Sequence, residues 1–417
     1  MKIKKNKKFW PILAVIVILF GGAMALNPSI QRRVVWKWIV AQAYLSGVIN
    51  PVSAIPTANA IIVTDTPSVT IPTSEIPKIT PTQEIQVTAT VMPTPTNAPL
   101  PEKMILNSPA YEKQDINNCG PATLTMYLRF YGWEGDQFTV SDLIKPIAQD
   151  RNVNVEELDY YVKNYAGWLK TNYRVGGNLE TIKKFIASGI PVMIEETFIF
   201  DESYWPNDDR WGGHYLLING YDDQRQQFLS QDSFVGPDHW FDYQQVDKQW
   251  QAFNRVYILV YTPDQEATVK QILGDNWDPD TNRKNALEAS LKETQEDPNN
   301  VFAWFNLGSN YVYFENYDLS TQAYDKARAI GWPQRMLRYQ FSPFIAYFHA
   351  LRTDDLMTLV NYALKRTPNS EEALLWNGWG LYRSGDKVKA IESFQAALQA
   401  HPNYLDAEYA LNYVMTN

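Results

Sequence analysis

The sequence predicts an α+β domain followed by an all-α domain of helical repeats, with a transmembrane helix and a disordered linker in front of them. Three observations support this prediction. The middle of the chain alternates helical and strand patterns, four C-terminal prolines recur at intervals of 35, 35 and 34 residues, and the first 103 residues lack the composition of a folded core. The predicted segments are an N-terminal anchor or signal segment at 1–50, a Pro/Thr-rich linker at 51–103, the α+β domain at 104–263 and the repeats at 264–417.

The N-terminal segment combines positive charge with an apolar run. Its first 50 residues contain eight basic and no acidic side chains, and five of the basic ones are lysines within residues 1–8. The uncharged run from Phe9 to Leu26 has 18 residues, which is at the lower limit for a membrane-spanning helix. Lysines in front of a span favour a cytoplasmic N-terminus. We therefore expect a single-pass protein of the cell membrane with its domains on the extracytoplasmic side.

A second interpretation of this segment stays open. Residues 23–25 (Ala-Met-Ala) have the small-x-small pattern of a cleavage site behind the apolar region of a secretory signal peptide. Cleavage would give a secreted protein, although Arg32, Arg33 and Lys37 are unusual so close to a new terminus. We favour the uncleaved anchor, and both interpretations place the rest of the chain outside the cytoplasm.

Two further segments precede the folded domains. Residues 34–49 are apolar and aromatic, which is typical of a helix lying against a membrane surface or of a short packed helix. Residues 51–101 contain ten prolines and eleven threonines but no glycine and no aromatic residue. Such a stretch cannot build its own core, so we expect an extended stalk that holds the domains away from the membrane.

Charge and cysteine content exclude several classes of function. Residues 51–417 carry 29 basic and 46 acidic side chains, a net charge of −17, which argues against a nucleic-acid partner because like charges repel. Cys119 is the single cysteine, so an internal disulfide and a Cys-rich zinc site are excluded. The four histidines lack the spacing of metal ligands, and we expect neither a metal nor another cofactor.

Helix and strand signals alternate through the α+β domain. Helices are predicted from apolar periodicity and from the Gly189 and Pro191 that end one of them, and strands from runs of β-branched and aromatic residues. The predicted helices begin at Gly120 and cover 140–148, 155–165 and 179–188, and the predicted strands cover 191–198, 212–223, 227–232 and 255–261.

Four residues of this domain combine into a candidate catalytic site. Cys119 lies at the start of a helix, where the helix dipole and free amides lower the pKa of a thiol. His214 begins one strand of a predicted hairpin and Asp232 ends the next, so antiparallel pairing brings the imidazole and the carboxylate together. Gln114, five residues before the cysteine, can supply an amide to an oxyanion hole. The alternative for a lone cysteine is a small buried apolar residue.

These residues occur in a familiar context. The order Gln, Cys, His, Asp resembles the double-glycine (bacteriocin-leader-processing) peptidase-like family, a branch of the papain-like cysteine proteases, over residues 104–263. The matching segments are Gln114, residues 118–122 (Asn-Cys-Gly-Pro-Ala), residues 213–222 (Gly-His-Tyr-Leu-Leu-Ile-Asn-Gly-Tyr-Asp) and residues 231–233 (Gln-Asp-Ser).

The resemblance implies a thiol protease with a role for each residue. It implies Cys119 as nucleophile, His214 as general base and then acid, Asp232 as orienting carboxylate and Gln114 as oxyanion donor. This chain departs from the transporter-linked members, because it has no Walker A loop and no further predicted spans, so a leader-peptide substrate is not implied. The acidic loop at 197–211 is interpreted as either a cleft lining that favours basic substrates or a solvated loop.

The C-terminal repeats resemble tetratricopeptide helix pairs. Pro298, Pro333, Pro368 and Pro402 give a period near 34 residues. The unit at 334–368 diverges, with Phe344 where a small residue is expected. Such arrays form concave surfaces that bind peptides or proteins, with a spacer role as the alternative. The two best-matching units share small and large apolar positions at Trp304, Leu307, Gly308, Tyr311, Tyr324, Ala327, Gly378, Ala390, Phe394 and Ala397.

Three functions fit these observations. The first is an extracytoplasmic cysteine peptidase acting on a peptide or protein substrate, with a further protein partner on the repeats. The second is a catalytically silent papain-like binding module or scaffold at the cell envelope. The third is an acyl-transferring relative that uses the same residues. The complete Gln, Cys, His and Asp set favours an enzyme, because a binding module has no need of all four.

Overall fold

The computed structural model describes residues 28–49, 51–59, 99–145, 153–203 and 207–417. Among them, residues 103–261 hold a seven-stranded antiparallel sheet in the order β2-β7-β3-β4-β5-β6, with β1 paired to the far end of β4. The strands are β1 (Lys103–Ile105), β2 (Lys170–Arg174), β3 (Val192–Ile199), β4 (Trp211–Asp222), β5 (Gln227–Asp232), β6 (Gly236–Asp242) and β7 (Tyr257–Tyr261).

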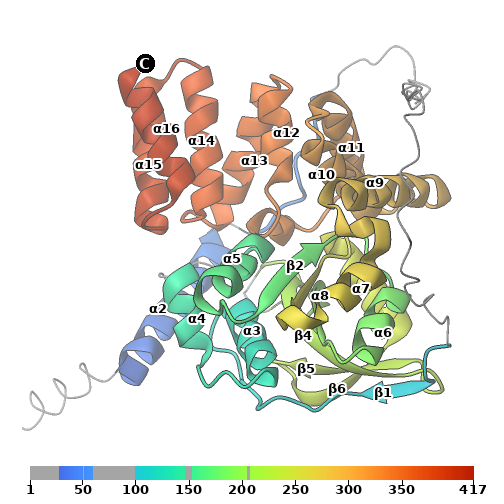
Figure 1. Cartoon of the computed structure of the whole chain (residues 1–417). Coiled ribbons are helices and arrows are strands. Elements are labelled where there is room, and N and C mark those ends of the chain that lie inside the picture. The colour runs from blue at the N-terminus through green and yellow to red at the C-terminus, as the bar shows by residue number, and fades with distance from the viewer. Residues whose placement is uncertain (1–27, 50, 60–98, 146–152, 204–206) are drawn as a thin grey trace, which may run out of the picture.

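Helices cover both faces of this sheet (Figure 1). Side chains of β3, β4 and β7 alternate between the faces, so Met193 belongs to the core under one layer of helices and Ile194 to the core under the other. The first layer consists of α3 (Cys119–Phe130), α4 (Gln137–Ile144) and α5 (Val155–Tyr165). The second consists of α6 (Leu179–Ala187), α7 (Tyr243–Trp250) and α8 (Glu266–Leu273). The α+β class predicted from the sequence is confirmed.

Helix α8 belongs to this domain, whereas we assigned residues from 264 onward to the repeats. Val269 and Leu273 of α8 are buried in the core that α6 and α7 share with the sheet. Arg174 of β2 also donates to the main-chain oxygens of Asn276 and Trp277 directly after α8. The helical array therefore begins at α9, because the segment before it covers apolar surface of the sheet.

The C-terminal region is an array of antiparallel helices, which runs in Figure 1 from α9 at the right to α16 at the left. Gly308 and Gly378 sit where paired helices approach closely: a Cβ at these positions would meet the rings of Tyr324 at 2.8 Å and Phe394 at 2.4 Å. In the divergent unit, Phe344 is fully buried. The helices are α9 (Pro279–Glu296), α10 (Val301–Tyr313), α11 (Tyr317–Ile330), α12 (Ser342–His349), α13 (Thr353–Arg366), α14 (Glu371–Arg383), α15 (Lys387–Ala400) and α16 (Leu405–Thr416).

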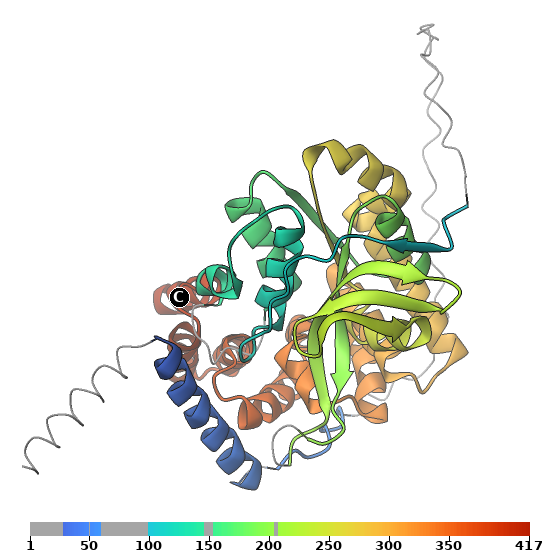
Figure 2. The same cartoon turned by 90° about the horizontal axis from the view of Figure 1, so that it is seen from below.

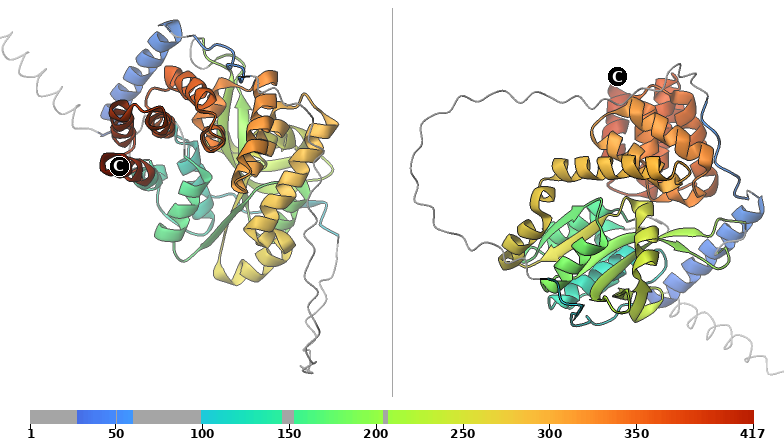
Figure 3. Two further views of the ribbon diagram at one scale, coloured as in Figure 1. Left: turned by 90° about the horizontal axis from the view of Figure 1, so that it is seen from above. Right: turned by 90° about the vertical axis from the view of Figure 1, so that its right-hand side faces the viewer.

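The two domains share one apolar core. Phe305, Trp332 and Met336 of the helical domain belong to the same buried cluster as Leu124 of α3 and Leu158 of α5. Figure 3 shows the helical array lying over the α+β domain from two directions. A short 3₁₀ helix, η4 (Gln334–Arg338), connects α11 to α12 and contacts β4. The helical domain is therefore packed directly against the strand that carries His214.

The segment before residue 60 also packs against the body of the protein. Helix α2 (Pro28–Ile49) lies beside the loop between β3 and β4 (Figure 2), where the Asn207 side chain donates to the Gly47 carbonyl at 3.0 Å. Its exposed side chains include Val34, Trp38 and Leu45. Within the described ranges, no helix is both long and apolar enough to cross a membrane. The predicted span at 9–26 lies outside those ranges.

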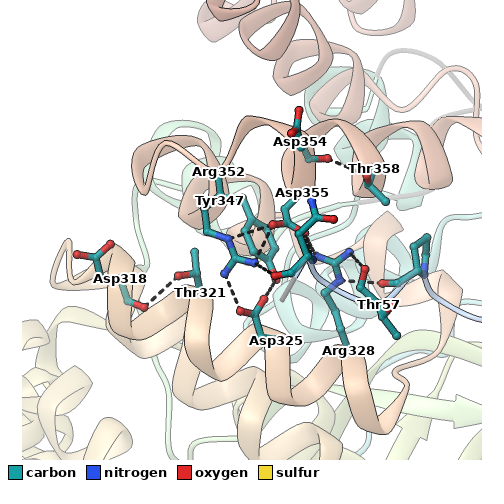
Figure 4. Close-up of polar contacts among 12 residues, drawn as sticks. Thr57, Asp318, Thr321, Asp325, Arg328, Tyr347, Arg352, Asp354, Asp355 and Thr358 are labelled. Atoms are coloured by element: carbon teal, nitrogen blue, oxygen red, sulfur yellow. Dashed lines mark hydrogen bonds and ion pairs between the residues drawn. The ribbon is translucent and has the colours of Figure 1, made fainter. Parts of the chain in front are cut away.

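Residues 51–59 differ from the expected free linker, because they lie on the helical domain. Arg328 donates to the carbonyls of Pro56 and Thr57, both at 2.9 Å, and Asp355 accepts the amide of Asn59 at 3.0 Å (Figure 4). Arg328 itself is paired with Asp355 at 3.0 Å and is fully buried. Proline composition correctly indicates an extended chain without its own core, but the carbonyls of an extended chain can still accept hydrogen bonds from another domain.

Candidate active site

Cys119 is the first residue of helix α3, as the sequence predicts. The turn before it uses a left-handed backbone at Asn117 (φ 51°), and the Asn118 side-chain amide donates to Gln137 at 2.9 Å. Gly120 follows the cysteine under the ring of Tyr215, where an added Cβ would lie 3.3 Å from a ring carbon. Pro121 is the third helical residue and lies within the first turn, whose amides have no helical partner. The helix start is thereby fixed against β4.

His214 and Asp232 are brought together by the pairing of β4 with β5. Asp232 is opposite Leu216, two residues beyond the histidine on the same face of β4. The Nε2 atom of His214 lies 2.8 Å from Oδ1 of Asp232. That oxygen also accepts the backbone amides of Phe234 at 2.8 Å and Val235 at 3.0 Å, and the Asp232 side chain is fully buried. A carboxylate held by three donors fixes the orientation of the imidazole.

The thiol and the imidazole favour each other's charged forms. Burial raises the pKa of Cys119, but a hydrogen bond to His214, the charges of His214 and Lys145, and the Gly120 amide together lower it below its ordinary value. Burial lowers the pKa of His214, whereas Asp232 and Cys119 raise it to about 10. Because Nε2 of the histidine contacts Asp232, Nδ1 is the ring nitrogen that remains for the thiol. The site therefore favours a thiolate–imidazolium pair at neutral pH.

Gln114 is tied to the same corner of the sheet. Its amide nitrogen on the main chain donates to the Ser233 carbonyl at 2.9 Å, and its side-chain Oε1 accepts from the Ser233 hydroxyl at 2.9 Å. Ser233 directly follows Asp232. With Oε1 held by the serine, Nε2 is the end of the side chain that can donate to a substrate oxygen.

Sequence reasoning missed a group of charged residues around this site. Glu195 and Glu196 are consecutive on β3, opposite Tyr215 and His214. Burial raises the pKa of Glu195 well above the ordinary value, and the nearby Tyr215 hydroxyl, which donates to the Val153 carbonyl at 2.9 Å, opposes this change only in part. Glu196 is 2% exposed, its Oε2 has no hydrogen-bond partner among the described residues, and its pKa rises to about 8. Two acidic residues in an otherwise apolar strand were the signal that could have identified them.

The acidic loop before β4 holds both exposed and buried carboxylates. Asp201 and Glu202 are exposed, as the solvated-loop interpretation predicts, whereas Asp208 is buried. Its Oδ2 lies 3.1–3.2 Å from Arg335, Arg338 and Arg366 of the helical domain. These arginines lower the pKa of Asp208 far below its ordinary range despite burial. The loop binds the helical domain because three guanidinium groups share its carboxylate.

The remaining histidines lie in structural surroundings. The ring of His349 stacks on Tyr317 with centroids 4.5 Å apart, and His239 lies beside Phe241 at the same separation. His401 lies 3.4 Å from Glu371. Across the described part of the chain, no group of three or more histidine, cysteine or acidic side chains is arranged to hold a metal ion.

Comparison with known proteins identifies the middle domain. Residues 105–258 match the model of the Peptidase_C39 like family, which is less than half of the chain. A search of curated proteins gave no match. Among solved structures, the peptidase domain of Streptococcus ComA, a bi-functional ABC transporter involved in a quorum sensing pathway, is similar with 14% identity. The match covers 37% of this chain and 99% of the ComA peptidase domain, at a TM-score of 0.29.

Two further solved structures are similar to different parts of the chain. A double glycine motif protease from an AMS/PCAT transporter, in complex with the leader peptide, has 17% identity, covering 38% of this chain and 94% of that chain at a TM-score of 0.28. YrrB, a TPR protein with an unusual peptide-binding site, has 20% identity, covering 32% of this chain and 68% of that chain at a TM-score of 0.28. The family match thus covers the middle domain alone: residues 105–258 of this chain are similar to the Peptidase_C39 like family.

Proposed function

We propose that this protein is a cysteine peptidase that hydrolyses peptide bonds with Cys119, His214 and Asp232. The observation that carries the proposal is the arrangement around His214: its Nε2 contacts Asp232 at 2.8 Å, and Asp232 together with Cys119, at the start of a helix, raises the pKa of the imidazole. A binding domain gains nothing from a thiol with a lowered pKa beside a charged imidazole. The alternative of a catalytically silent module predicts an unreactive thiol.

The geometry supports a two-step reaction. The Cys119 sulfur attacks the substrate carbonyl carbon and forms a C–S bond, and the developing oxyanion accepts hydrogen bonds, for which Gln114 Nε2 is the candidate side-chain donor. His214 then gives its proton to the leaving amine as the C–N bond breaks. A water molecule that loses a proton to His214 attacks the thioester, and the acid product leaves as the C–S bond breaks. If an amine takes the place of water, the same steps give the acyl transfer that we considered as an alternative.

The location of the enzyme and its partner surface are part of the proposal. The lysines at 1–8 and the apolar run at 9–26 support a membrane anchor with the peptidase on the extracytoplasmic side. The period of the C-terminal helices and their position over the α+β domain support a peptide or protein ligand held near the active site.

The test uses the fact that the chain has one cysteine. Alkylation of the full-length protein with iodoacetamide, followed from pH 4 to pH 10, reports only on Cys119. We expect a midpoint well below that of a free thiol, which is about 8.5. Peptide turnover should fall at low pH as the thiolate is protonated and at high pH as His214 loses its proton near pH 10.

Two variants complete this test. Cys119→Ala should abolish labelling and turnover while leaving the fold intact, because a small residue at a helix start changes little packing. His214→Ala should move the alkylation midpoint toward the free-thiol value. A wild-type midpoint near 8.5 without turnover of any peptide in a library would overturn the proposal and favour the binding module.

A further inference from the structure

A residue of the helical domain, Tyr339, packs beside the candidate active site. Tyr339 follows η4, and both of its flanks are bound to the α+β domain. On one side, the Arg335 amide donates to Asp209 at 2.9 Å and its guanidinium pairs with Asp208 at 3.1 Å. On the other side, the Gln340 side chain donates to the Ala252 carbonyl at 2.9 Å. Tyr339 is therefore held in place against the peptidase domain from both directions.

The ring of Tyr339 lies directly on the backbone of Gly213, the residue before His214. A Cβ at Gly213 would be 3.1 Å from two carbons of the Tyr339 ring and 2.9 Å from the Phe253 ring, so a residue with a side chain does not fit while both rings stay. The ring also packs edge-on against Trp211, with centroids 5.7 Å apart. Residues from the helical domain thus cover β4 up to the position before the histidine.

The phenol makes polar contacts with the site. Its oxygen is close enough to the Gly213 backbone amide for that amide to lower the pKa of Tyr339. Burial raises the pKa of Tyr339, Arg335 and Arg338 lower it, and the charge of Cys119 raises it, with the result that it stays above the ordinary value. The phenol is therefore neutral at physiological pH and lies within electrostatic range of the thiol.

We propose that Tyr339 of the helical domain is a positioning residue of the peptidase site, which holds Gly213 and thereby keeps His214 beside Cys119. The proposal rests on the proposed function, because it concerns the same cysteine and histidine. Its consequence is that the peptidase site is complete only while the helical domain is docked on β4. The ring packs on Gly213, and the phenol oxygen adds a polar contact with the Gly213 amide next to the histidine.

The experiment compares two Tyr→Phe variants of the full-length protein. Tyr339→Phe keeps the ring that packs on Gly213 and removes only the hydroxyl. Tyr347→Phe is the control: it removes the hydroxyl of a fully buried tyrosine of the same domain, one that donates to Asp325 at 2.7 Å (Figure 4). The readouts are the midpoint of Cys119 alkylation with iodoacetamide against pH and the values of kcat and KM for a fluorogenic peptide cleaved by the wild type.

The two proposals predict separable results. We expect Tyr339→Phe to raise the alkylation midpoint by about one pH unit and to lower kcat about tenfold, the effect of one hydrogen bond, with both unchanged in Tyr347→Phe. If the wild type has the lowered midpoint and Tyr339→Phe keeps it, the positioning role is wrong and the proposed function stands. Equal effects in both variants mean a general loss of stability and also overturn the positioning role. An ordinary wild-type midpoint overturns both proposals.

Discussion

Replacing Glu196 by Gln should remove a loss of stability that the wild type suffers as the pH rises. Glu196 is 2% exposed, and its pKa rises from the ordinary 4.5 to about 8, mainly through burial, with Asp232 raising it further and His214 opposing the change. Between these two values the folded state keeps a proton that the unfolded state releases. The unfolded state therefore binds fewer protons, and the free energy of unfolding falls with increasing pH.

The magnitude follows from the two pKa values. Stability changes by at most about 1.4 kcal/mol per pH unit in this window, which amounts to about 5 kcal/mol over the whole interval from 4.5 to about 8. Glutamine has the same shape and does not ionise. Between pH 5.5 and pH 7.5 the variant should gain up to about 3 kcal/mol relative to the wild type, and the gain should be small below pH 5.

Urea unfolding of the full-length proteins, followed by tryptophan fluorescence at pH 5.5, 6.5 and 7.5, measures this difference. Glu288→Gln, an exposed position on α9, provides a control for the loss of one carboxylate. Parallel pH dependences of the wild type and Glu196→Gln would refute the reasoning. They would mean that Glu196 is ionised in the folded state at neutral pH and that its charge is compensated by His214.

The remaining predictions concern packing between and within the domains. Asp208→Ala should lower the free energy of unfolding by about 3–5 kcal/mol, because three buried guanidinium groups lose the carboxylate that they share. Thermal unfolding measures the effect. A midpoint unchanged within error would contradict the role of Asp208 as an interdomain contact. Gly308→Ala should cost about 1–3 kcal/mol in urea unfolding, since the added methyl group would lie 2.8 Å from the Tyr324 ring, whereas Gly385→Ala at a positive φ of 87° tests backbone strain with no neighbour within 4 Å. An equal loss in the free energy of unfolding for Gly308→Ala and Gly385→Ala would show that close helix packing is not what requires Gly308.

The elements that were predicted most accurately carry their own local signals. The helix at Val155–Tyr165 begins with a capping box between Asn154 and Glu157, and the strand at Gln227–Asp232 follows a turn directly after a long apolar strand. The contact of His214 with Asp232 was predictable for the same reason, because a hairpin between neighbouring strands determines it. Local sequence therefore sufficed to bring these two side chains together.

Elements that depend on distant partners escaped the sequence analysis. Strand β2 (Lys170–Arg174) has no apolar alternation, and it is a strand because β7 pairs with all five of its residues. The partners of Asp208 lie more than 120 residues further along the chain, so an acidic loop gave no indication that it was buried. The contact of Tyr339 with Gly213 could not be predicted for a similar reason. A tyrosine between two helices of a divergent repeat has no local feature that relates it to a catalytic histidine.

Residues 51–59 determine how helix α2 is attached to the folded domains. Helix α2 is joined to the β3–β4 loop through Asn207, which also accepts the amide of Val52 at 2.9 Å, and Arg328 then holds the chain on the helical domain. At the far end of the segment, Tyr221 donates to the Pro101 carbonyl at 2.8 Å and β1 joins the sheet. The described segments on both sides of residues 60–98 are thus bound to the folded domains. The height of Cys119 above whatever surface carries α2 is then set by the contacts that α2 and residues 51–59 make with these domains.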